Sequence, residues 1–394
     1  MADSQTGRFP RCIFHYLTPN FLNMLIGVFK EPASDARVSL LPEHVAQLKK
    51  TGCELLVESG AGEQAFAGDE AYRSAGARIG SREEVQSQSA ILLGINPPAT
   101  ALREKSVLIG LFQPLFHPQQ VHEWAKAGAT VFSLDMLPRT TRAQSMDVLS
   151  SQANIAGYKA VLLAAGMYSR YFPMFMTAAG SIPPAKMLIL GAGVAGLQAI
   201  ATARRLGAVV EVFDTRPAVK EEVMSLGGKF IEVEGAADAS SAGGYAVEQS
   251  EDFMNRQKAK IAESVAKADI VITTAQIPGK KAPVLITRPM IESMRNGSVI
   301  VDLAAATGGN TECTQNNTTI RHNGVSIVGN SLLQATLPSD ASKLYGKNVL
   351  NFLQLITDKS GGLNLNFEDD LVKGSCIAHQ GAVTNERIQQ LIKN

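Results

Sequence analysis

The chain has 394 residues, of which 45% are hydrophobic and 19% charged, and its formal net charge is +1. A single hydrophobic core stops growing below this length, so an ordinary globular protein of two domains is expected. The balanced charge gives no reason to expect nucleic acid as a partner, and the four widely spaced cysteines give none to expect a metal site or a disulfide framework.

Residues 1–24 lack the apolar core of a secretory signal and form an extension of unknown order. After them, short apolar runs alternate with helical stretches. This alternation predicts an α/β fold with a largely parallel sheet. The predicted elements are a strand at Leu25 to Phe29, a helix at Pro42 to Thr51, and strands at Cys53 to Glu58, Ala90 to Ile95, Val107 to Phe112 and Thr130 to Leu134.

A long helical stretch from Ser150 to Phe172 contains no strand, and its length suits a helix that crosses between two domains. Its longest apolar run, around Ala160 to Met167, is well short of the roughly 18 to 20 residues that a membrane-spanning helix needs. The sequence therefore predicts no membrane-spanning segment here, and a second unit beyond the helix.

The second unit begins with a strand, a glycine turn, a helix and another strand between residues 186 and 216. Gly191, Gly193 and Gly196 have the G-x-G-x-x-G spacing of a dinucleotide-binding turn. The first glycine permits the tight turn, the second lets a pyrophosphate approach the backbone, and the third lets the helix pack close to the strand. The free N–H groups of the helix N-terminus favour the phosphates.

Asp214 ends the second strand of this unit, 18 residues after Gly196. A carboxylate at this position accepts hydrogen bonds from the adenosine ribose and repels a 2′-phosphate, which favours NAD over NADP. Arg216 stands close enough to weaken that repulsion. The sequence therefore predicts an NAD(H) site.

Six strands are predicted in this unit, enough for a doubly wound sheet. A helix at Ala341 to Thr357 follows, and the tail GGLNLNFEDDLVKGSCIAHQG reads as short strands and turns. We therefore predict two Rossmann-like domains with mostly parallel sheets, the NAD domain (146–337) being inserted into a domain built from both chain ends (25–145 and 338–394). The six strands begin near Met187, Val209, Phe230, Ile270, Val299 and Val325.

Several segments from about residue 25 to the chain end resemble one family. They include RVSLLPE, VESGAGE, LPRTTRAQSMDVLSSQANIAGYKAV, FDTRPAVKEEV, SAGGYA, TTAQIPGKKAPVLIT and VDLAAATGGN. The chain resembles domain I, the NAD(H)-binding alpha-subunit domain, of proton-translocating nicotinamide nucleotide transhydrogenase, which is related to alanine dehydrogenase. RAQSMDVLSS and the TTA-x-IPGK-x-AP pattern are the specific parts of this match.

The resemblance implies direct hydride transfer between NAD(H) held here and NADP(H) held by a partner domain, domain III. In the full enzyme this transfer is coupled to proton movement through a membrane domain, domain II. The resemblance also implies a homodimer at the cytoplasmic side of the inner membrane, or in the mitochondrial matrix of a eukaryote. Such a reaction needs two rings held together without water, and it needs no general acid or base.

Residue by residue, the match implies two sets of site residues and no metal. The residues expected around the nicotinamide and its ribose, with a tyrosine on a closing loop, are Arg139, Gln144, Asp147, Ser150 and Tyr245. The residues expected to contact the nucleotide are Gly191, Gly193, Val194, Gly196, Asp214, Thr215, Arg216, Gly244 and Gln276.

Two other functions stay open, an alanine dehydrogenase and a non-catalytic NAD-binding relative. Alanine dehydrogenase handles a proton with a lysine and a histidine, and the resembling positions here hold Gly94 and Gln113, which cannot shuttle one. The segment 330–336, NSLLQAT, also departs from the transhydrogenase pattern.

Some of the singled-out residues also have plainer explanations. The charged residues between Arg139 and Asp147 could merely cap the crossing helix. Met174 and Met176 read as core or interdomain filler. The acidic segment FEDDLVK reads as a solvated strand edge or turn.

Overall fold

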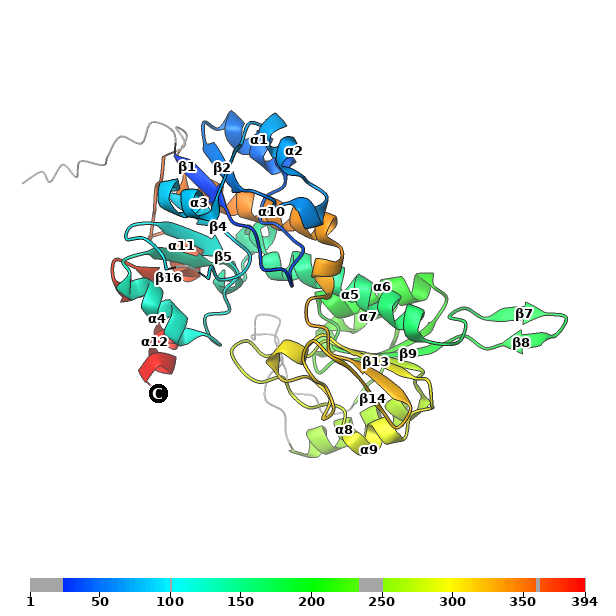
Figure 1. Cartoon of the computed structure of the whole chain (residues 1–394). Helices are drawn as coiled ribbons and strands as arrows, with labels where there is room; N and C mark the ends of the chain where they lie inside the picture. Colours follow the sequence, from blue (N-terminus) through cyan, green and yellow to red (C-terminus); the bar gives the residue numbers. More distant parts are fainter. Residues whose placement is uncertain (1–23, 100, 234–250, 359–361, 394) are drawn as a thin grey trace, which may run out of the picture.

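The computed structural model describes residues 24–99, 101–233, 251–358 and 362–393. Two sheets, each covered by helices, form two units that are joined by long helices (Figure 1). The predicted α/β fold with mostly parallel strands is confirmed.

The first sheet takes strands from both ends of the described chain, in the order β17-β16-β6-β5-β4-β1-β2-β3. All neighbours are parallel except at β16, which runs antiparallel to both β6 and β17. Its strands are β1 (Leu25–Val28), β2 (Glu54–Glu58), β3 (Arg78–Gly80), β4 (Ile91–Leu93), β5 (Val107–Gly110), β6 (Thr130–Ser133), β16 (Cys376–His379) and β17 (Ala382–Val383). Its helices are α1 (Pro42–Lys50), α2 (Asp69–Ser74), α3 (Arg82–Gln88), α4 (Pro118–Lys126), α11 (Asp370–Ser375) and α12 (Glu386–Lys393).

The second sheet has the order β11-β10-β9-β12-β13-β15-β14. All six predicted strands are present, and the added strand β14 pairs antiparallel at the edge. The strands are β9 (Lys186–Leu190), β10 (Val209–Phe213), β11 (Lys229–Phe230), β12 (Ile270–Thr273), β13 (Val299–Asp302), β14 (Thr319–His322) and β15 (Val325–Val328). The helices are α6 (Val194–Arg205), α7 (Lys220–Ser225), α8 (Glu251–Lys267) and α9 (Arg288–Glu292).

Two long helices, α5 (Val148–Met167) and α10 (Pro338–Ile356), connect the two units and pack against each other. Each is preceded by a short 3₁₀ helix, η3 (Thr141–Met146) before α5 and η6 (Leu333–Thr336) before α10. The second unit is thus inserted into the first, as predicted. The exact boundaries at 145/146 and 337/338 stay a prediction.

The crossing helix α5 ends at Met167, five residues before the predicted Phe172. Tyr168 has extended backbone angles and Pro173 follows shortly, and the residue before a proline disfavours the helical region. The chain then forms a β-hairpin from β7 (Phe175–Thr177) and β8 (Gly180–Ile182) that projects from the second unit (Figure 1). This hairpin was not predicted.

The interpretation of two methionines as core filler was wrong. Met174 is 63% exposed and Met176 is 73% exposed, because both belong to the projecting hairpin and its approach.

The chain's tail also differs from the prediction of short strands and turns. Residues Asp370–Ser375 form helix α11, because the Asp369 carboxylate accepts hydrogen bonds from the backbone N–H groups of Leu371 (2.9 Å) and Val372 (3.4 Å). An aspartate in this position is a favoured N-cap. The acidic segment is therefore a helix start, and the two predicted strands follow it as β16 and β17.

Within the described part of the chain, no helix combines the length and the apolar character needed to cross a bilayer.

Candidate functional site

The glycine turn between β9 and α6 has the geometry that a dinucleotide site needs. Gly191 has a φ of +108°, and a Cβ there would overlap the Thr274 hydroxyl. A Cβ on Gly196 would overlap the carbonyl oxygen of Gly191. By contrast, a Cβ on Gly193 would meet no atom within 4 Å, and Gly193 is the N-cap of α6. The first and third glycines are thus required by the protein's own packing, and the second faces open space at a helix N-terminus.

Asp214 follows β10 and reaches back to the glycine turn. Its Oδ2 accepts a hydrogen bond from the Ala192 N–H at 2.7 Å. The Arg216 side chain folds over the same carboxylate, with Nε at 2.9 Å from Oδ1 and Nη2 at 2.7 Å from Oδ2. This hydrogen bonding raises the pKa of Arg216. A ribose that binds Asp214 must therefore replace contacts that Arg216 makes here.

The loop after β12 carries Gln276, whose Nε2 donates to the Leu303 carbonyl at 2.9 Å. The loop is held by Asn310, which is fully buried. Its Oδ1 accepts from the Ala275 N–H at 3.0 Å, and its Nδ2 donates to the carbonyls of Ala275 and Pro283, both at 2.8 Å. Sequence reasoning missed Asn310, although it ends the family-like segment VDLAAATGGN.

The remaining predicted nucleotide contacts fall into two groups. Val194, at the start of α6, is 40% exposed, and Thr215 is half-buried between Asp214 and Arg216. Gly244 and Tyr245 lie outside the described residues.

The predicted nicotinamide residues lie in the loop 139–147 and in the first turn of α5. The Asp147 carboxylate accepts hydrogen bonds from the Ser150 N–H (2.9 Å) and hydroxyl (2.6 Å) and so caps α5. Arg139 and Gln144 are exposed. The capping interpretation therefore holds for Asp147, and the structure brings Asp147 and Ser150 together at the helix N-terminus.

Helix packing links this loop to the glycine turn. Gly157 of α5 lies so close to α6 that a Cβ there would overlap the Ala195 carbonyl. Asn154 of α5 also donates to Oε1 of Gln198 at 3.3 Å. Asp147 precedes Gly157 by ten residues, or about 15 Å along the helix. The two sets of predicted site residues therefore lie at two points along α5, and Gly157, which sequence reasoning did not single out, sets the approach of α6.

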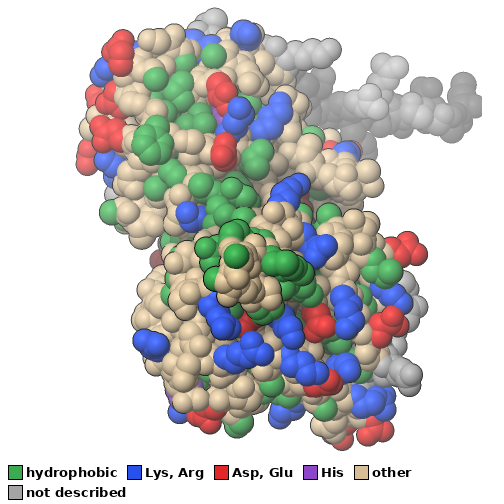
Figure 2. Space-filling view, turned by 90° about the vertical axis from the view of Figure 1, so that its right-hand side faces the viewer, with side chains coloured by type: hydrophobic (Ala, Val, Ile, Leu, Met, Phe, Trp, Pro, Cys, Tyr) green, Lys and Arg blue, Asp and Glu red, His purple; other side chains and the backbone are tan. Residues whose placement is uncertain are grey.

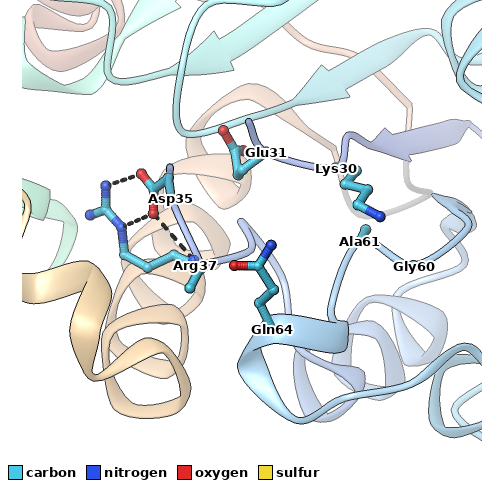
Figure 3. A pocket seen from close by; sticks show the side chains of 8 residues that line it. Lys30, Glu31, Asp35, Arg37, Gly60, Ala61 and Gln64 are labelled. Carbon is cyan, nitrogen blue, oxygen red and sulfur yellow. Dashed lines mark hydrogen bonds and ion pairs between the residues drawn. The ribbon is translucent and has the colours of Figure 1, made fainter. Parts of the chain in front are cut away.

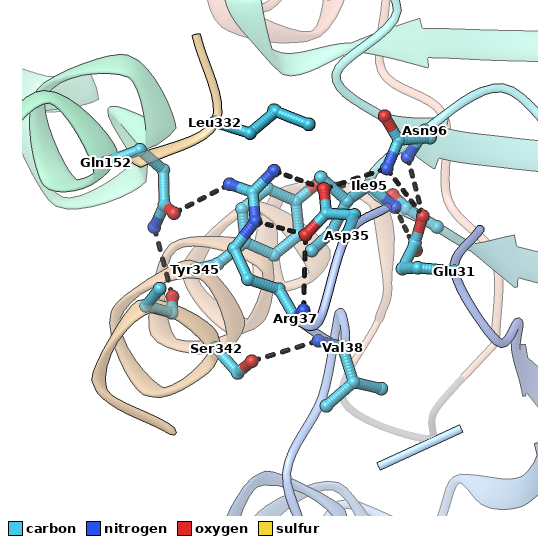
Figure 4. Close-up of polar contacts among 12 residues, drawn as sticks. Glu31, Asp35, Arg37, Val38, Ile95, Asn96, Gln152, Leu332, Ser342 and Tyr345 are labelled. Carbon is cyan, nitrogen blue, oxygen red and sulfur yellow. Dashed lines mark hydrogen bonds and ion pairs between the residues drawn. The ribbon is translucent and has the colours of Figure 1, made fainter. Parts of the chain in front are cut away.

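A second polar cluster lies where the loop after β1 meets α5 and α10 (Figure 4). Arg37, 4% exposed, forms a two-point ion pair with Asp35, at 2.8 Å from Nε to Oδ1 and 2.6 Å from Nη2 to Oδ2. Its Nη1 donates to Gln152 of α5 at 2.8 Å, and Gln152 donates to the Ala341 carbonyl of α10 at 3.0 Å. Burial raises the Asp35 pKa, but the Arg37 contacts outweigh it and lower the pKa overall. This cluster fastens both crossing helices to the first unit.

Beside it, Glu31 and Arg37 line a small polar pocket that also includes Lys30 and Gln64 (Figure 3). The Glu31 carboxylate accepts from the N–H groups of Ile95 (2.6 Å) and Asn96 (3.0 Å) and from the Asn96 side chain (2.9 Å). Burial is the largest influence on it and raises its pKa from 4.5 to about 7, against the lowering by these hydrogen bonds.

Gly94 stands next to this carboxylate, since a Cβ there would lie 3.7 Å from Glu31 Oε1. A side chain at position 94 would therefore point toward Glu31. The families that this chain resembles carry a lysine at this position. With a glycine here, the Glu31 carboxylate is held by the amide groups of Ile95 and Asn96.

The unusual segment NSLLQAT forms η6 and packs against α5. Leu333 is 2% exposed within the core of the second unit, and the Leu332 N–H donates to Asn330 Oδ1 at 2.9 Å. Figure 4 shows Leu332 at the edge of the Arg37 cluster. The departure from the family pattern therefore lies at the junction of the two units.

Comparison with known proteins agrees with this architecture. Residues 27–156 match the family model "Alanine dehydrogenase/PNT, N-terminal domain", and residues 160–386 match "Alanine dehydrogenase/PNT, C-terminal domain". Over 377 residues the chain is 45% identical to the first of the chains that make up the NAD(P) transhydrogenase alpha subunit of Rhodospirillum rubrum, covering 92% of this chain and 98% of that protein.

Two solved structures extend the comparison. A transhydrogenase from Sinorhizobium meliloti superposes with a TM-score of 0.83 at 44% identity, covering 91% of this chain and 99% of that one. An L-alanine dehydrogenase has a TM-score of 0.75 at 25% identity, covering 94% and 99% of the two chains. The chain therefore belongs to the alanine dehydrogenase/PNT family, and within it to the group of transhydrogenase alpha subunits.

Proposed function

We propose that this protein is the NAD(H)-binding component of a proton-translocating NAD(P) transhydrogenase. The observation that carries the proposal is the joint placement of a dinucleotide turn and the 139–147 loop along one helix, α5. The high identity to the R. rubrum subunit supports it.

The residues around the turn fit a dinucleotide. The open space at Gly193 and the free N–H groups at the start of α6 suit a pyrophosphate. Asp214 suits the adenosine ribose, and its negative charge favours NAD(H) over NADP(H). Arg216 tempers this preference because its guanidinium pairs with the carboxylate. Bound NAD(H) would supply hydride chemistry at its nicotinamide ring.

The chain's own residues orient the ring and exclude water. Arg139 and Gln144 are exposed polar groups on the loop, where a ring and a partner domain that brings NADP(H) can meet them. Asp147 and Ser150 fix the loop's end to α5. No proton needs to move at the reacting carbons, so these residues act by positioning, which can contribute about 7 to 11 kcal/mol in well-oriented systems.

An alanine dehydrogenase is the weaker alternative. It requires an acid and a base near the reacting carbon, and the two positions that would hold them carry Gly94 and Gln113. The match to transhydrogenase subunits is also closer, at 45% identity against 28% for the alanine dehydrogenase of Bacillus subtilis.

Reconstitution tests this function. The purified chain alone should bind NADH, detected by the nucleotide's fluorescence, and should turn over neither alanine nor NADP⁺. Adding an NADP(H)-binding domain from a related transhydrogenase should start hydride transfer, measured with an NADH analogue whose product absorbs separately. Alanine-dependent NADH formation by the chain alone would instead support the dehydrogenase, and NADH binding without transfer would support a non-catalytic relative.

The partners follow from the same proposal. The NADP(H)-binding domain III and the membrane domain II are expected as further transhydrogenase components, which places this chain at the cytoplasmic or matrix surface of the membrane. A second copy of the chain is the third expected partner.

The projecting hairpin supports the homodimer. Figure 2 views the molecule from the side to which the hairpin projects and shows apolar side chains gathered on it. Phe175 is 44% exposed and stacks on Tyr171 at 5.1 Å between ring centroids, while Met174 and Met176 are still more exposed. Exposed apolar groups gathered in one place mark interaction surfaces, and a second copy related by two-fold symmetry covers such an arm without leaving an open end.

Replacing three of these apolar side chains should therefore give a monomer. The triple variant Met174→Ser, Phe175→Ser and Met176→Ser should halve the solution mass measured by light scattering, while circular dichroism stays that of the wild type. A surface methionine elsewhere, Met224→Ser, is the control, since Met224 is 57% exposed on α7. A wild-type monomer, or a triple variant that remains a dimer, would rule out the hairpin as the dimer contact.

A further inference from the structure

The loop 139–147 is held from outside by helix α10. The backbone carbonyl of Ser145 accepts two hydrogen bonds, from Nδ2 of Asn348 and from Nδ2 of Asn351, each at 2.8 Å. The two asparagines are three residues apart on α10 and therefore lie on the same face of the helix. A carbonyl oxygen has two lone pairs, and here both are engaged by side chains. The loop's position thus depends on two amides that are about 200 residues away in sequence.

Asn348 ties the loop to α5 as well. It is 8% exposed, and its Oδ1 accepts a hydrogen bond from the Ser151 hydroxyl at 2.8 Å. One amide group therefore joins the loop, through Ser145, to the first turn of the helix that Asp147 caps. A buried amide whose two ends bind different elements fixes the distance between them, because losing either bond leaves a buried polar group unpaired.

A third attachment comes from the chain's tail. Nη2 of Arg142 lies 2.5 Å from an oxygen of Asp369 and 2.6 Å from one of Asp370. Asp369 is also the N-cap of α11, so its carboxylate is fixed by the helix before it meets the arginine. Arg142 is half exposed, and an exposed ion pair contributes little by itself. The paired asparagines are therefore the stronger attachment.

We propose that Asn348 and Asn351 are positioning residues for hydride transfer, with Asp369 in a supporting role. They touch neither nucleotide. They hold the Ser145 carbonyl, and through it the segment that carries Gln144 and Asp147, at a set place relative to α5. This inference rests on the proposed function, because the loop matters only if it faces the two nicotinamide rings.

The expected effect is large because hydride transfer is sensitive to geometry. A misplacement of about 1 Å at a reacting group can cost about a hundredfold in rate. NADH affinity should change much less, since the glycine turn and Asp214 lie on other elements. The signature is thus a fall in kcat with an almost constant Kd for NADH.

The isosteric variants Asn348→Asp and Asn351→Asp test the idea. Each keeps the size of the side chain and removes the N–H that binds Ser145, and Asn348→Asp keeps the oxygen that accepts from Ser151. With a matched NADP(H)-binding domain, each should lower the transfer rate at saturating nucleotide at least tenfold and leave the Kd for NADH within about twofold. In the free chain, amide hydrogen exchange should quicken in residues 139–147 and stay unchanged in α6.

Gln389→Glu is the matched control. Gln389 donates one amide hydrogen bond to the Val383 carbonyl at 2.6 Å, at the far end of the first sheet. It should lower the unfolding temperature without changing the transfer rate or loop exchange. Equal losses of rate in the control, or unchanged exchange and rate in both asparagine variants, would overturn the inference. If Asn348→Asp fails to fold, the more exposed Asn351 decides the outcome. Absence of transfer in the wild type would count against the proposed function instead.

Discussion

Gly193→Ala should abolish tight NADH binding and leave the fold intact, whereas Gly196→Ala should damage the fold itself. A Cβ on Gly193 meets open space, and its φ of −80° suits alanine. The methyl group would therefore stand where we expect the pyrophosphate and nowhere else. A Cβ on Gly196 would overlap the Gly191 carbonyl, so α6 would have to move away from β9.

Two measurements separate these outcomes. For Gly193→Ala, the Kd for NADH should rise at least tenfold, about 1.4 kcal/mol, with an unfolding temperature within about 2 °C of the wild type. For Gly196→Ala, the unfolding temperature should fall by roughly 5 to 10 °C, as expected for overpacking that costs about 1–3 kcal/mol. A Gly193→Ala protein that still binds NADH tightly would show that the pyrophosphate does not lie at this turn.

The stability of the protein should fall as the pH rises from 4.5 to 8, and Glu31 should account for up to about 3 kcal/mol of the fall. The folded chain holds the Glu31 proton up to a pKa of about 7, because burial disfavours the charge, whereas the unfolded chain releases it near 4.5. Between these values the folded state binds more protons, so the unfolding free energy decreases with pH. The contribution is fully present below pH 4.5 and is lost as the pH passes 7.

Denaturant unfolding of the wild type and of Glu31→Gln at several pH values measures this contribution. The glutamine cannot ionise, so the difference between the two proteins should change over this range, whatever other groups titrate. Asp35, Arg37 and Lys30 are the charged neighbours, and they are the same in both proteins. Glu70→Gln, at an exposed site, controls for the loss of a carboxylate as such. A constant difference from pH 4.5 to 8 would show that Glu31 is already ionised at the low end.

The local elements were predictable because short-range physics decides them. The apolar run Lys186–Leu190, the glycine spacing and the helix Val194–Arg205 follow from the sequence almost to the residue. The glycine roles were equally readable, since Gly191 needs a positive φ and Gly196 a close approach. The hairpin at Phe175–Ile182 was missed because its apolar residues resemble a buried segment when no partner copy is considered.

Some of the candidate site could not be read from the sequence. Asn310 and Gly157 matter through contacts with segments that are distant along the chain, and no local pattern marks them. Asn348 and Asn351 are ordinary polar residues of an amphipathic helix until α10 packs beside the loop. The tail's short helix was missed because its start depends on one aspartate cap.

The sequence by itself determined the α/β class, the dinucleotide turn and the family, because strand and helix periodicity and the special backbone of glycine act over a few residues. Only the tertiary structure decided how Asp147, Ser145 and Asn348 come together, how Arg216 covers Asp214, and why Glu31 holds its proton. Those properties arise from burial and from hydrogen bonds between distant segments, and both exist only once the two units have folded around α5 and α10.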